Sequence, residues 1–438
     1  MKNIKFAFDN CLISPENILE TAGKLRPEIE NMVQATSKGY ENDKAWINLP
    51  DDRDMLKKVK EVIRDKRRLN PKYLVVVGIG GSNLGTMAVQ EAVLGKLYNQ
   101  LNPAIKVLYA DTVDTDYISS IVKIIEPALK DGSNVVINCI SKSGTTTETA
   151  VNFEVLLNVL HKCKRNYEDC VVVTSDRNSE LWNLGQEKGF DMLEIPEKVG
   201  GRYSVLSAVG LFPLGLLGLD LEELLAGAKS IRDLCISDNI DENTSAKSAS
   251  IQFSHYKRGI NIFDLFLFSS NLESLGKWNR QLVAESLGKE YNKKGIKVNA
   301  GLTPTVSVGS IDLHSIAQLY LGGPYDKFTI FVSVQNDNSL LKVPKLQDYA
   351  EIVAGIRGKN LKTIMDAILE GTKMAFKERQ RPYTEIILPD KSEYSIGQFL
   401  QFKMIETIYL GYLLDVNPFG QPSVESYKKE TRQILSQK

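Results

Sequence analysis

Hydroxyl side chains are concentrated in one short segment of the sequence, residues 141–149. The segment reads SKSGTTTET, and six of its nine residues are Ser or Thr. An apolar run precedes it and a pattern typical of a helix follows it, so the hydroxyls stand at a helix N-terminus. Hydroxyls and free backbone N–H groups at that position suit a phosphate monoester. A helix cap needs only one such residue, so the segment favours a phosphate site over an ordinary cap.

A glycine-rich loop, GIGGSNLG at 78–85, follows the apolar run YLVVV. Glycines let backbone N–H groups approach a ligand closely. The loop does not match the dinucleotide-binding fingerprint, because Asn83 stands where the third glycine belongs. In addition, Asp111 lies 33 residues after Gly78 instead of about 20. The pattern GxxxxGK followed by Ser or Thr does not occur either. From this loop alone, a ligand site and a plain strand–helix turn are equally good interpretations.

Two further segments carry a charged residue in a setting that suits catalysis. Gly200 and Gly201 precede Arg202, which lets a guanidinium come close to a ligand. Glu285 follows Leu-Val-Ala in an expected helix, with Gln281 one turn earlier on the same face. A carboxylate with apolar neighbours can have a raised pKa and act as a general base. Taken singly, a solvated arginine and a surface glutamate explain these residues more simply.

Two other candidates lie further along the chain. His314 is one of only three histidines and is expected to open a helix over 310–321. The stretch between Lys289 and His314 is long and irregular in pattern. Near the C-terminus, NPFGQPSVESYK at 417–428 breaks the chain and restarts a helix that reaches Lys428. Taken alone, His314 can be explained as a packed or capping histidine, and the segment 417–428 as a turn in the tail.

The candidate residues stand on alternating strands and helices. We expect helices at 15–38 and 51–69 before the first strand, YLVVV. Strands are then expected at 106–111, 134–141 and 170–176, with helices at 84–98, 116–129, 145–162 and 178–188. This alternation is typical of βαβ units and predicts an α/β fold with a doubly wound parallel sheet.

The second half of the chain predicts another α/β unit. A helical region at 204–258 is followed by expected strands at 261–270, 327–334 and 384–389. Helices are expected at 272–288, 310–321, 344–356, 360–377 and 394–415. FSSNLESLG after the first of these strands echoes GIGGSNLG in the first half, which is weak evidence for a duplicated domain.

Composition limits the function classes. The 438 residues include 43% apolar and 25% charged residues, enough for a sizeable core. Lys and Arg number 54 and so do Asp and Glu, giving zero formal net charge. A nucleic-acid or polyanion binder would show a basic excess, so that class is disfavoured, whereas a single small anionic ligand is not.

Metal, disulfide and membrane functions are also disfavoured. The three histidines are far apart in sequence, so a metal site built from them is not expected. Five scattered cysteines without a CxxC pair fit a reducing cytoplasm. The N-terminal residues do not read as a signal peptide. The longest apolar run, 205–219, is shorter than the ~20 residues of a spanning helix.

Together, and in this order, GIGGSNLG, SKSGTTTET, GGRYS, ESLGK, DLHS and PFGQPSVESYK resemble the successive signatures of the glucose-6-phosphate isomerase (phosphoglucose isomerase) family. The chain length resembles the compact bacterial members. The resemblance implies two sugar-isomerase α/β domains, each a parallel sheet flanked by helices. We therefore expect an N-terminal helical segment, two such domains and a C-terminal helical segment carrying Lys428, at 1–69, 70–215, 216–390 and 391–438.

The resemblance also implies an activity and its residues. Family members interconvert glucose 6-phosphate and fructose 6-phosphate in glycolysis and gluconeogenesis, through ring opening and a cis-enediol(ate), without metal or organic cofactor. Carried over by motif position, Glu285 would be the base, Arg202 would stabilise the intermediate, and His314 with Lys428 would open the ring. The residues implied to bind substrate are Gly81, Ser82, Ser141, Lys142, Ser143, Thr145, Thr146, Gln281 and Gln421.

In the family the histidine comes from the other subunit, so the resemblance implies a homodimer with shared sites and no nucleic-acid or membrane partner. The sequence departs from the family at Gly420 and Ser423, where Asp and Gly are common. Both departures precede Lys428. A non-catalytic sugar-phosphate sensor is a weaker alternative, and a dehydrogenase is the least favoured. An isomerase of another sugar, such as mannose 6-phosphate, stays open, because the configuration at C2 is set by the shape of the pocket.

Overall fold

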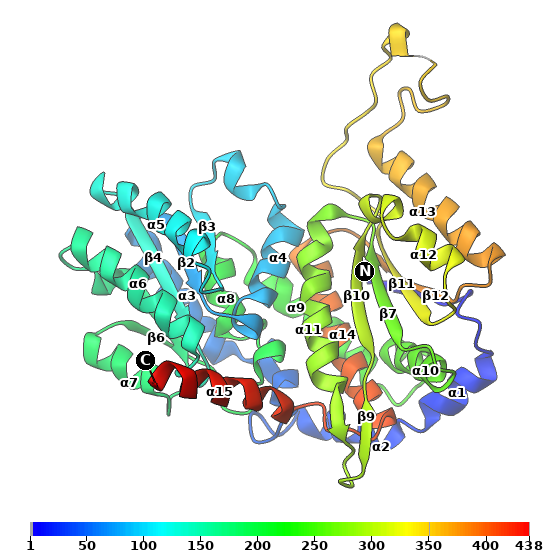
Figure 1. Cartoon of the computed structure of the whole chain (residues 1–438), viewed down its shortest axis with the longest axis horizontal. Helices are drawn as coiled ribbons and strands as arrows, with labels where there is room; N and C mark the ends of the chain where they lie inside the picture. The colour runs from blue at the N-terminus through cyan, green and yellow to red at the C-terminus, as the bar shows by residue number, and fades with distance from the viewer. Residues whose placement is uncertain (1–2, 350, 438) are drawn as a thin grey trace.

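Two sheets, one in each half of the chain, organise the structure (Figure 1). The computed structural model describes residues 3–349 and 351–437. The first sheet has the order β3-β2-β4-β5-β6 and is parallel throughout. Its strands are β2 (Pro71–Val77), β3 (Lys106–Ala110), β4 (Asn134–Ile140), β5 (Val171–Ser175) and β6 (Asp191–Glu194). The four strands that the sequence predicted here are confirmed, and β6 is added at one edge.

The second sheet has the order β1-β12-β11-β7-β10. Four of its strands are parallel, namely β7 (Ile262–Leu267), β10 (Thr303–Val308), β11 (Lys327–Val334) and β12 (Tyr383–Leu388). The N-terminal segment adds β1 (Lys5–Ala7) as an antiparallel edge strand. The predicted architecture of two α/β units is confirmed. In the second sheet, β1 runs antiparallel to the other strands.

The stretch between Lys289 and His314 contains strands that the sequence pattern did not predict. β8 (Lys289–Tyr291) and β9 (Lys297–Ala300) form an antiparallel hairpin, and β10 follows directly. β10 contains Pro304, which cannot donate a ladder hydrogen bond. As the edge strand of its sheet, β10 tolerates this proline, which explains why the segment did not read as a strand.

Helices cover both sheets and fill the space between them (Figure 1). None of the described helices is long and apolar enough to cross a membrane. The helices are α1 (Pro15–Gly23), α2 (Arg26–Ala35), α3 (Arg53–Arg68), α4 (Leu84–Leu94), α5 (Thr115–Lys130), α6 (Thr147–Cys163), α7 (Glu180–Lys188), α8 (Ala208–Leu216), α9 (Leu221–Cys235), α10 (Thr244–Lys257), α11 (Glu273–Leu287), α12 (Ala317–Gly322), α13 (Leu361–Glu378), α14 (Glu393–Leu413) and α15 (Glu425–Ser436).

Two helix predictions are corrected in detail. The single helix expected at 15–38 is two helices, α1 and α2. Pro27 lies in the first turn of α2, where a proline starts a helix but cannot continue one from before. The helix expected at 310–321 is a 3-10 turn, Ile311–His314, followed by the short α12, so His314 ends a turn instead of opening a helix.

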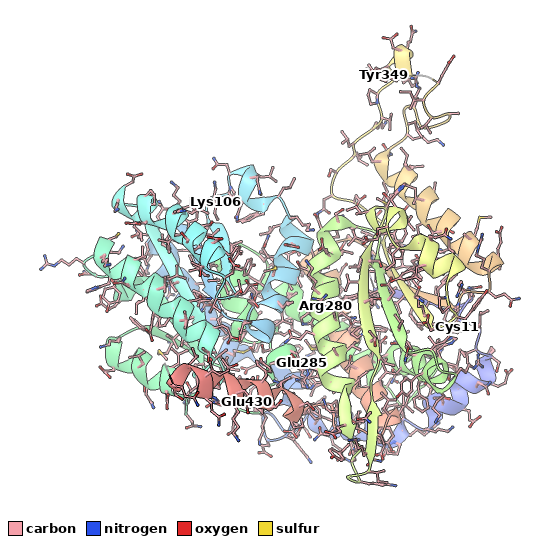
Figure 2. All side chains as sticks on the ribbon, viewed as in Figure 1. Cys11, Lys106, Arg280, Glu285, Tyr349 and Glu430 are labelled. Atoms are coloured by element: carbon pink, nitrogen blue, oxygen red, sulfur yellow. The ribbon has the colours of Figure 1, made fainter. Side chains whose placement is uncertain are left out.

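The helix expected at 344–356 is wrong. Its described residues contain only a 3-10 turn, Gln347–Tyr349, and residue 350 lies outside the described residues. The chain here forms a projecting arm, residues 340–349 and 351–358, with Tyr349 near its far end (Figures 1 and 2). Leu340 and Ile352 on this arm are 82% and 72% exposed. A short helix is marginal in water without a surface to pack on, and the exposed side chains of the arm's described residues meet no such surface.

The main hydrophobic core spans both halves, and each half has a smaller core cluster of its own. α14, buried along most of its length, packs on α9, where a Cβ at Gly397 would lie 2.1 Å from the carbonyl oxygen of Leu224. α4 of the first half packs on α11 of the second, and a Cβ at Gly85 would meet the side chains of Val205 and Trp278. These close contacts fix the carboxyl edge of the first sheet beside α11.

Candidate active site

Two loops meet at the carboxyl edge of the first sheet. β2 and β4 are parallel neighbours with Val77 opposite Cys139, so the segments that follow them leave the sheet side by side. They touch at Gly78, where a Cβ would lie 3.0 Å from the carbonyl oxygen of Ile140. In open α/β sheets, ligands bind outside this edge. The glycine-rich loop and the hydroxyl-rich segment therefore form one neighbourhood.

The hydroxyl-rich segment forms a tight turn with its own hydrogen bonds. Ser141 Oγ accepts from the Gly144 N–H at 3.1 Å and donates to Thr146 Oγ1 at 3.2 Å, and Ser143 Oγ accepts from the Thr145 N–H at 3.3 Å. Gly144 has φ +72°, a conformation that other residues rarely adopt. Thr146 is the N-cap of α6 but makes no side-chain capping bond. The first N–H groups of α6 are therefore left for an anion.

Lys142 lies in the same turn and is half-buried. Burial lowers the pKa of its ammonium below the ordinary lysine value. A bound anion would raise the pKa of Lys142 again, because it stabilises the ammonium. The turn offers this cation together with hydroxyl and amide donors.

A contact between two glycine loops connects this edge to the second half of the chain. The 3-10 turn Gly80–Ser82 packs against the 3-10 turn Gly201–Tyr203. A Cβ at Gly81 would lie 2.2 Å from the carbonyl carbon of Gly201. Only glycine fits there, because real Cβ atoms do not approach backbone so closely. The contact places Arg202 beside the loop that contains Gly81 and Ser82.

The Arg202 guanidinium is the centre of the site. It is 4% exposed and lies 5.3 Å from the centre of the Tyr203 ring. Its nitrogens donate to Ser286 Oγ at 2.8 Å, Gln421 Oε1 at 3.1 Å, Glu285 Oε2 at 3.3 Å, and the carbonyl oxygens of Pro418 at 2.5 Å and Phe419 at 3.0 Å. The rigid fork of an arginine suits such a set of partners. Arg202 thus joins three segments that are far apart in sequence.

Glu285 lies near the end of α11 and between the two halves of the molecule (Figure 2). Its side chain is 31% exposed, so one carboxylate is accessible while it pairs with the buried Arg202. Glu285 Oε1 accepts a hydrogen bond from Gln281 Nε2 at 3.0 Å. Gln281 also lies next to Gly80, and its Oε1 is buried without a hydrogen-bond partner. The sequence placed Gln281 and Glu285 on one helix face, which the structure confirms.

Three residues of this cluster had no role in the sequence interpretation. Tyr203 and Ser286 share a 2.8 Å hydrogen bond, and burial raises the pKa of the Tyr203 hydroxyl. Lys289 is 9% exposed and donates to the carbonyl oxygen of Glu285. All three belong to the motifs GGRYS and ESLGK, so their motif membership was the signal that pointed to them.

His314 lies apart from Glu285 in this chain. Gly301, just before β10, lies against Gly288 at the end of α11, whereas His314 follows the other end of β10. The strand between them spans roughly 20 Å. His314 is exposed, and Asp312 in the same turn accepts the N–H of Val308 at 2.7 Å. The chain therefore presents this histidine at its surface, away from its own Arg202–Glu285 pair.

His255 and Lys428 also lie outside the cluster around Arg202. His255 is buried, contacts the carbonyl oxygen of Cys11 at 2.7 Å, and has its pKa lowered by burial to about 4, so it is a neutral core residue. Lys428 lies on α15 and pairs with Glu425 at 2.8 Å. Thus Gln421 joins the cluster around Arg202, whereas Lys428, seven residues later (421 to 428), does not.

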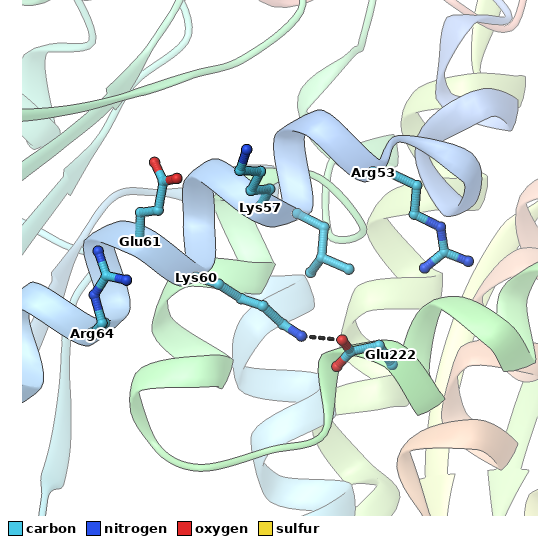
Figure 3. A pocket seen from close by; sticks show the side chains of 7 residues that line it. Arg53, Lys57, Lys60, Glu61, Arg64 and Glu222 are labelled. Carbon is cyan, nitrogen blue, oxygen red and sulfur yellow. Dashed lines mark hydrogen bonds and ion pairs between the residues drawn. The ribbon is translucent and has the colours of Figure 1, made fainter.

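Two other kinds of site are not supported. The described residues contain no group of three or more His, Cys, Asp or Glu side chains that could hold a metal ion. A shallow basic hollow on α3 is lined by Arg53, Leu56, Lys57, Lys60, Glu61, Arg64 and Glu222 (Figure 3). Lys60 pairs there with Glu222 and both are exposed, which is typical of solvated surface charge. None of the sequence-predicted residues lies in this hollow.

The contact between glycine loops makes a prediction about stability. Gly81→Ala forces a methyl group into the backbone of Gly201, so we expect the free energy of unfolding to fall by about 2–4 kcal/mol. Gly200→Ala is the matched control, since Gly200 has φ −71° and its nearest side-chain atom would lie 3.5 Å away. Thermal and urea unfolding of both variants measure the effect. Equal stability of the two variants would contradict the packing described for Gly81.

Comparison with known proteins relates this chain to one enzyme family. The family model for phosphoglucose isomerase matches residues 63–438. Glucose-6-phosphate isomerase of Carboxydothermus hydrogenoformans is 36% identical over 83% of this chain and 79% of its own length. The enzyme of the same name from Clostridium novyi is 31% identical over 93% of this chain and 91% of its own length.

Solved structures share the fold. A hypothetical protein of Thermus thermophilus superposes with a TM-score of 0.87 and 29% identity over 99% of both chains. A glucose-6-phosphate isomerase of Chlamydia trachomatis superposes with a TM-score of 0.83 and 19% identity, over 100% of this chain and 89% of its own. A tagatose-6-phosphate ketose/aldose isomerase of Escherichia coli gives a TM-score of 0.51 at 11% identity over 88% and 94%, which supports the sugar-isomerase fold. With the family model covering most of its length, this chain belongs to the phosphoglucose isomerase family.

Proposed function

We propose that this chain interconverts glucose 6-phosphate and fructose 6-phosphate by proton transfer through a cis-enediolate. The observation that carries the proposal is the Arg202–Glu285 pair, which lies across the Gly81–Gly201 contact from a hydroxyl-rich helix N-terminus. An anion site, a carboxylate base and a fixed cation are the three parts that isomerising a sugar phosphate requires. Family membership and the relatives' names point to the same reaction.

The phosphate would bind at the start of α6. Ser141, Ser143, Thr145 and Thr146 supply hydroxyls there, and Lys142 supplies the cation. Serine and threonine hydroxyls and backbone N–H groups donate to phosphate oxygens, and the helix N-terminus favours negative charge. Binding the phosphate anchors the sugar, whose hydroxyls then face Gly81, Ser82, Gln281 and Gln421. The unpaired Gln281 Oε1 is available to accept from one of these hydroxyls.

Glu285 would act as the base. Its carboxylate takes the proton from C2 of the open-chain aldose, and the C1 carbonyl becomes an enediolate oxygen. The proton of the C2 hydroxyl then passes to O1, the C2–O bond becomes the carbonyl, and Glu285 returns its proton to C1 to give the ketose. Gln281 holds one carboxylate oxygen and Arg202 holds the other, so the base is oriented before substrate arrives. A positioned base of this kind contributes typically ~10²–10⁴-fold to the rate.

Arg202 would stabilise the negative charge of the intermediate. Its guanidinium is a cation held in place by five acceptors. Fixed charge in a partly dry site needs no reorganisation during the reaction. A non-catalytic sensor of sugar phosphates has no need of a paired base and cation, which favours the isomerase over that alternative.

The remaining two residues, His314 and Lys428, would open the sugar ring, with His314 supplied by a second copy of the chain. Two features support a homodimer with shared sites. His314 is exposed and lies roughly one strand length from the Glu285 of its own chain. The projecting arm carries exposed apolar side chains such as Leu340 and Ile352, and patches of that kind mark interaction surfaces.

The proposal extends to domains and location. We expect the division at 69/70, 215/216 and 390/391 to separate two α/β domains from mostly helical segments at both ends, of which the N-terminal one also adds β1 to the second sheet. A cytoplasmic location fits the five cysteines, all of which are free.

Glu285→Gln tests the assigned base. We expect the kcat for glucose 6-phosphate conversion to fall by about 10²–10⁴-fold, because the amide cannot accept the proton. Titration with fructose 6-phosphate should show nearly unchanged affinity. Glu273→Gln is the matched control, since Glu273 lies on the same helix but pairs with Lys96 and Lys277. A wild-type chain that binds the sugar phosphate without turnover would be a sensor, and full activity of Glu285→Gln would remove this residue from the mechanism.

Mixed dimers test whether the sites are shared. Chains carrying Glu285→Gln are combined with chains carrying His314→Ala, and heterodimers are isolated through two affinity tags. If each site takes Glu285 from one chain and His314 from the other, one intact site remains, and we expect about half of the wild-type activity. If both residues act in the same chain, no intact site remains and the heterodimer should be as inactive as the two parent variants.

A further inference from the structure

The end of α11 carries an unusual hydrogen bond beside the site. The helix ends at Gly288, whose backbone turns to ψ 96° and whose N–H bonds to the carbonyl oxygen of Ala284. The next carbonyl in the helix is that of Glu285, and the backbone N–H four residues later belongs to Lys289, where β8 has already begun. The Lys289 ammonium donates to the Glu285 carbonyl oxygen in place of that N–H. One side chain thus holds the main chain of the residue assigned as the base.

The Lys289 ammonium is a buried cation that lies close to a second cation, Arg202. Lys289 is 9% exposed, and no carboxylate of the described residues forms an ion pair with its nitrogen. The charged groups that face it are Arg202 from the turn Gly201–Tyr203 and Glu285 from α11. Burial, followed by the charge of Arg202, lowers the pKa of Lys289 to about 8, while Glu285 opposes the shift. Near neutral pH the folded chain therefore holds two positive charges beside one carboxylate.

A purely structural role does not account for this arrangement. The lowered pKa means that the folded chain binds a proton at Lys289 more weakly than the unfolded chain does, so the buried charge costs folding free energy at neutral pH. An apolar side chain of the same length would fill the space without that cost. At many helix ends, water or an exposed lysine donates to the carbonyl oxygen that has no partner within the helix.

We propose that Lys289 is a positioning residue of the isomerase site, which ties the main chain of Glu285 and, with Arg202, holds positive charge beside the enediolate. The inference rests on the proposed function. Lys289 acts through its neighbours: its bond fixes the last turn of α11, which carries Glu285 and Ser286, and its charge adds to that of Arg202. It follows that the protonated form of Lys289 is the active form.

Three variants test the role of Lys289. In Lys289→Met we expect kcat to fall by about 10–100-fold with a change in KM of less than about threefold, because the effect lies in the transition state. Lys289→Arg keeps a charged donor and should recover most of the activity. Lys297→Met is the matched control, since Lys297 lies on the same hairpin but is exposed and pairs with Glu290. It should behave as the wild type.

The pH profile separates positioning from packing. As pH rises through about 8, Lys289 of the free enzyme loses its proton, and wild-type kcat/KM, which reports the free enzyme, should fall towards the level of Lys289→Met. This alkaline limb should be missing in Lys289→Met and lie at higher pH in Lys289→Arg. Burial also lowers the pKa of Lys142. If Lys142 caused the alkaline limb, the limb would remain in Lys289→Met, Lys289→Arg and Lys297→Met. A limb near pH 8 that is unchanged in Lys289→Arg overturns the proposal.

Stability provides the second readout. The unfolded chain binds more protons at Lys289 between about pH 8 and the ordinary lysine pKa, so this residue's contribution makes stability rise with pH over that window. Lys289→Met should therefore melt at the same or a higher temperature than the wild type at neutral pH, although it is less active. Lower activity that accompanies a lower melting temperature and an unchanged pH limb would mean a structural role and overturn the proposal.

The two proposals fail in different ways. A wild-type chain without isomerase activity overturns the proposed function and the role of Lys289 with it. An active wild type whose Glu285→Gln variant is inactive, but whose Lys289→Met variant has normal kcat and pH profile, overturns only the role of Lys289.

Discussion

The Arg202 guanidinium is the interaction on which the site depends. It is almost fully buried, and its five hydrogen bonds reach the end of α11 and the segment before α15. A buried arginine without these acceptors would be strongly destabilising, so the positions of Glu285, Ser286 and Gln421 are coupled to it. Its own position depends on the Gly81–Gly201 contact, where two backbones touch because neither has a side chain. The fold thus brings the Arg202 cation, the Glu285 carboxylate and the hydroxyl-rich turn together through one charged group and one pair of glycines.

The same cluster concentrates positive charge within a chain of zero net charge. Arg202 and Lys289 lie beside Glu285, and Lys142 lies in the hydroxyl-rich turn. Burial lowers the pKa of both lysines, so the site without substrate holds cations at a cost in free energy that a dianionic sugar phosphate would offset. The chain leaves His314 outside this cluster and exposed, which is the physical reason for proposing that a second copy completes the site.

Strands buried on both faces were predictable from the sequence, and so were the loops that follow them. YLVVV and NVVINCI read as strands because both faces are covered, and the glycine-rich and hydroxyl-rich segments follow them directly. β10 was missed because an edge strand tolerates Pro304 and polar residues. The projecting arm was read as a helix because local pattern does not reveal whether a surface exists to pack on. The role of Lys289 was also beyond the sequence, since it depends on where α11 ends and on how close Arg202 lies.

We propose that Arg202 stabilises the enediolate more than it binds the sugar. The most direct test is the affinity of wild type and Arg202→Gln for a five-carbon phosphorylated hydroxamate, which mimics the enediolate, and for fructose 6-phosphate. We predict that Arg202→Gln loses about 10²-fold or more in affinity for the hydroxamate and only a few-fold for fructose 6-phosphate. Equal losses of affinity for the two ligands would show that Arg202 only binds substrate, and would contradict its role in stabilising the enediolate.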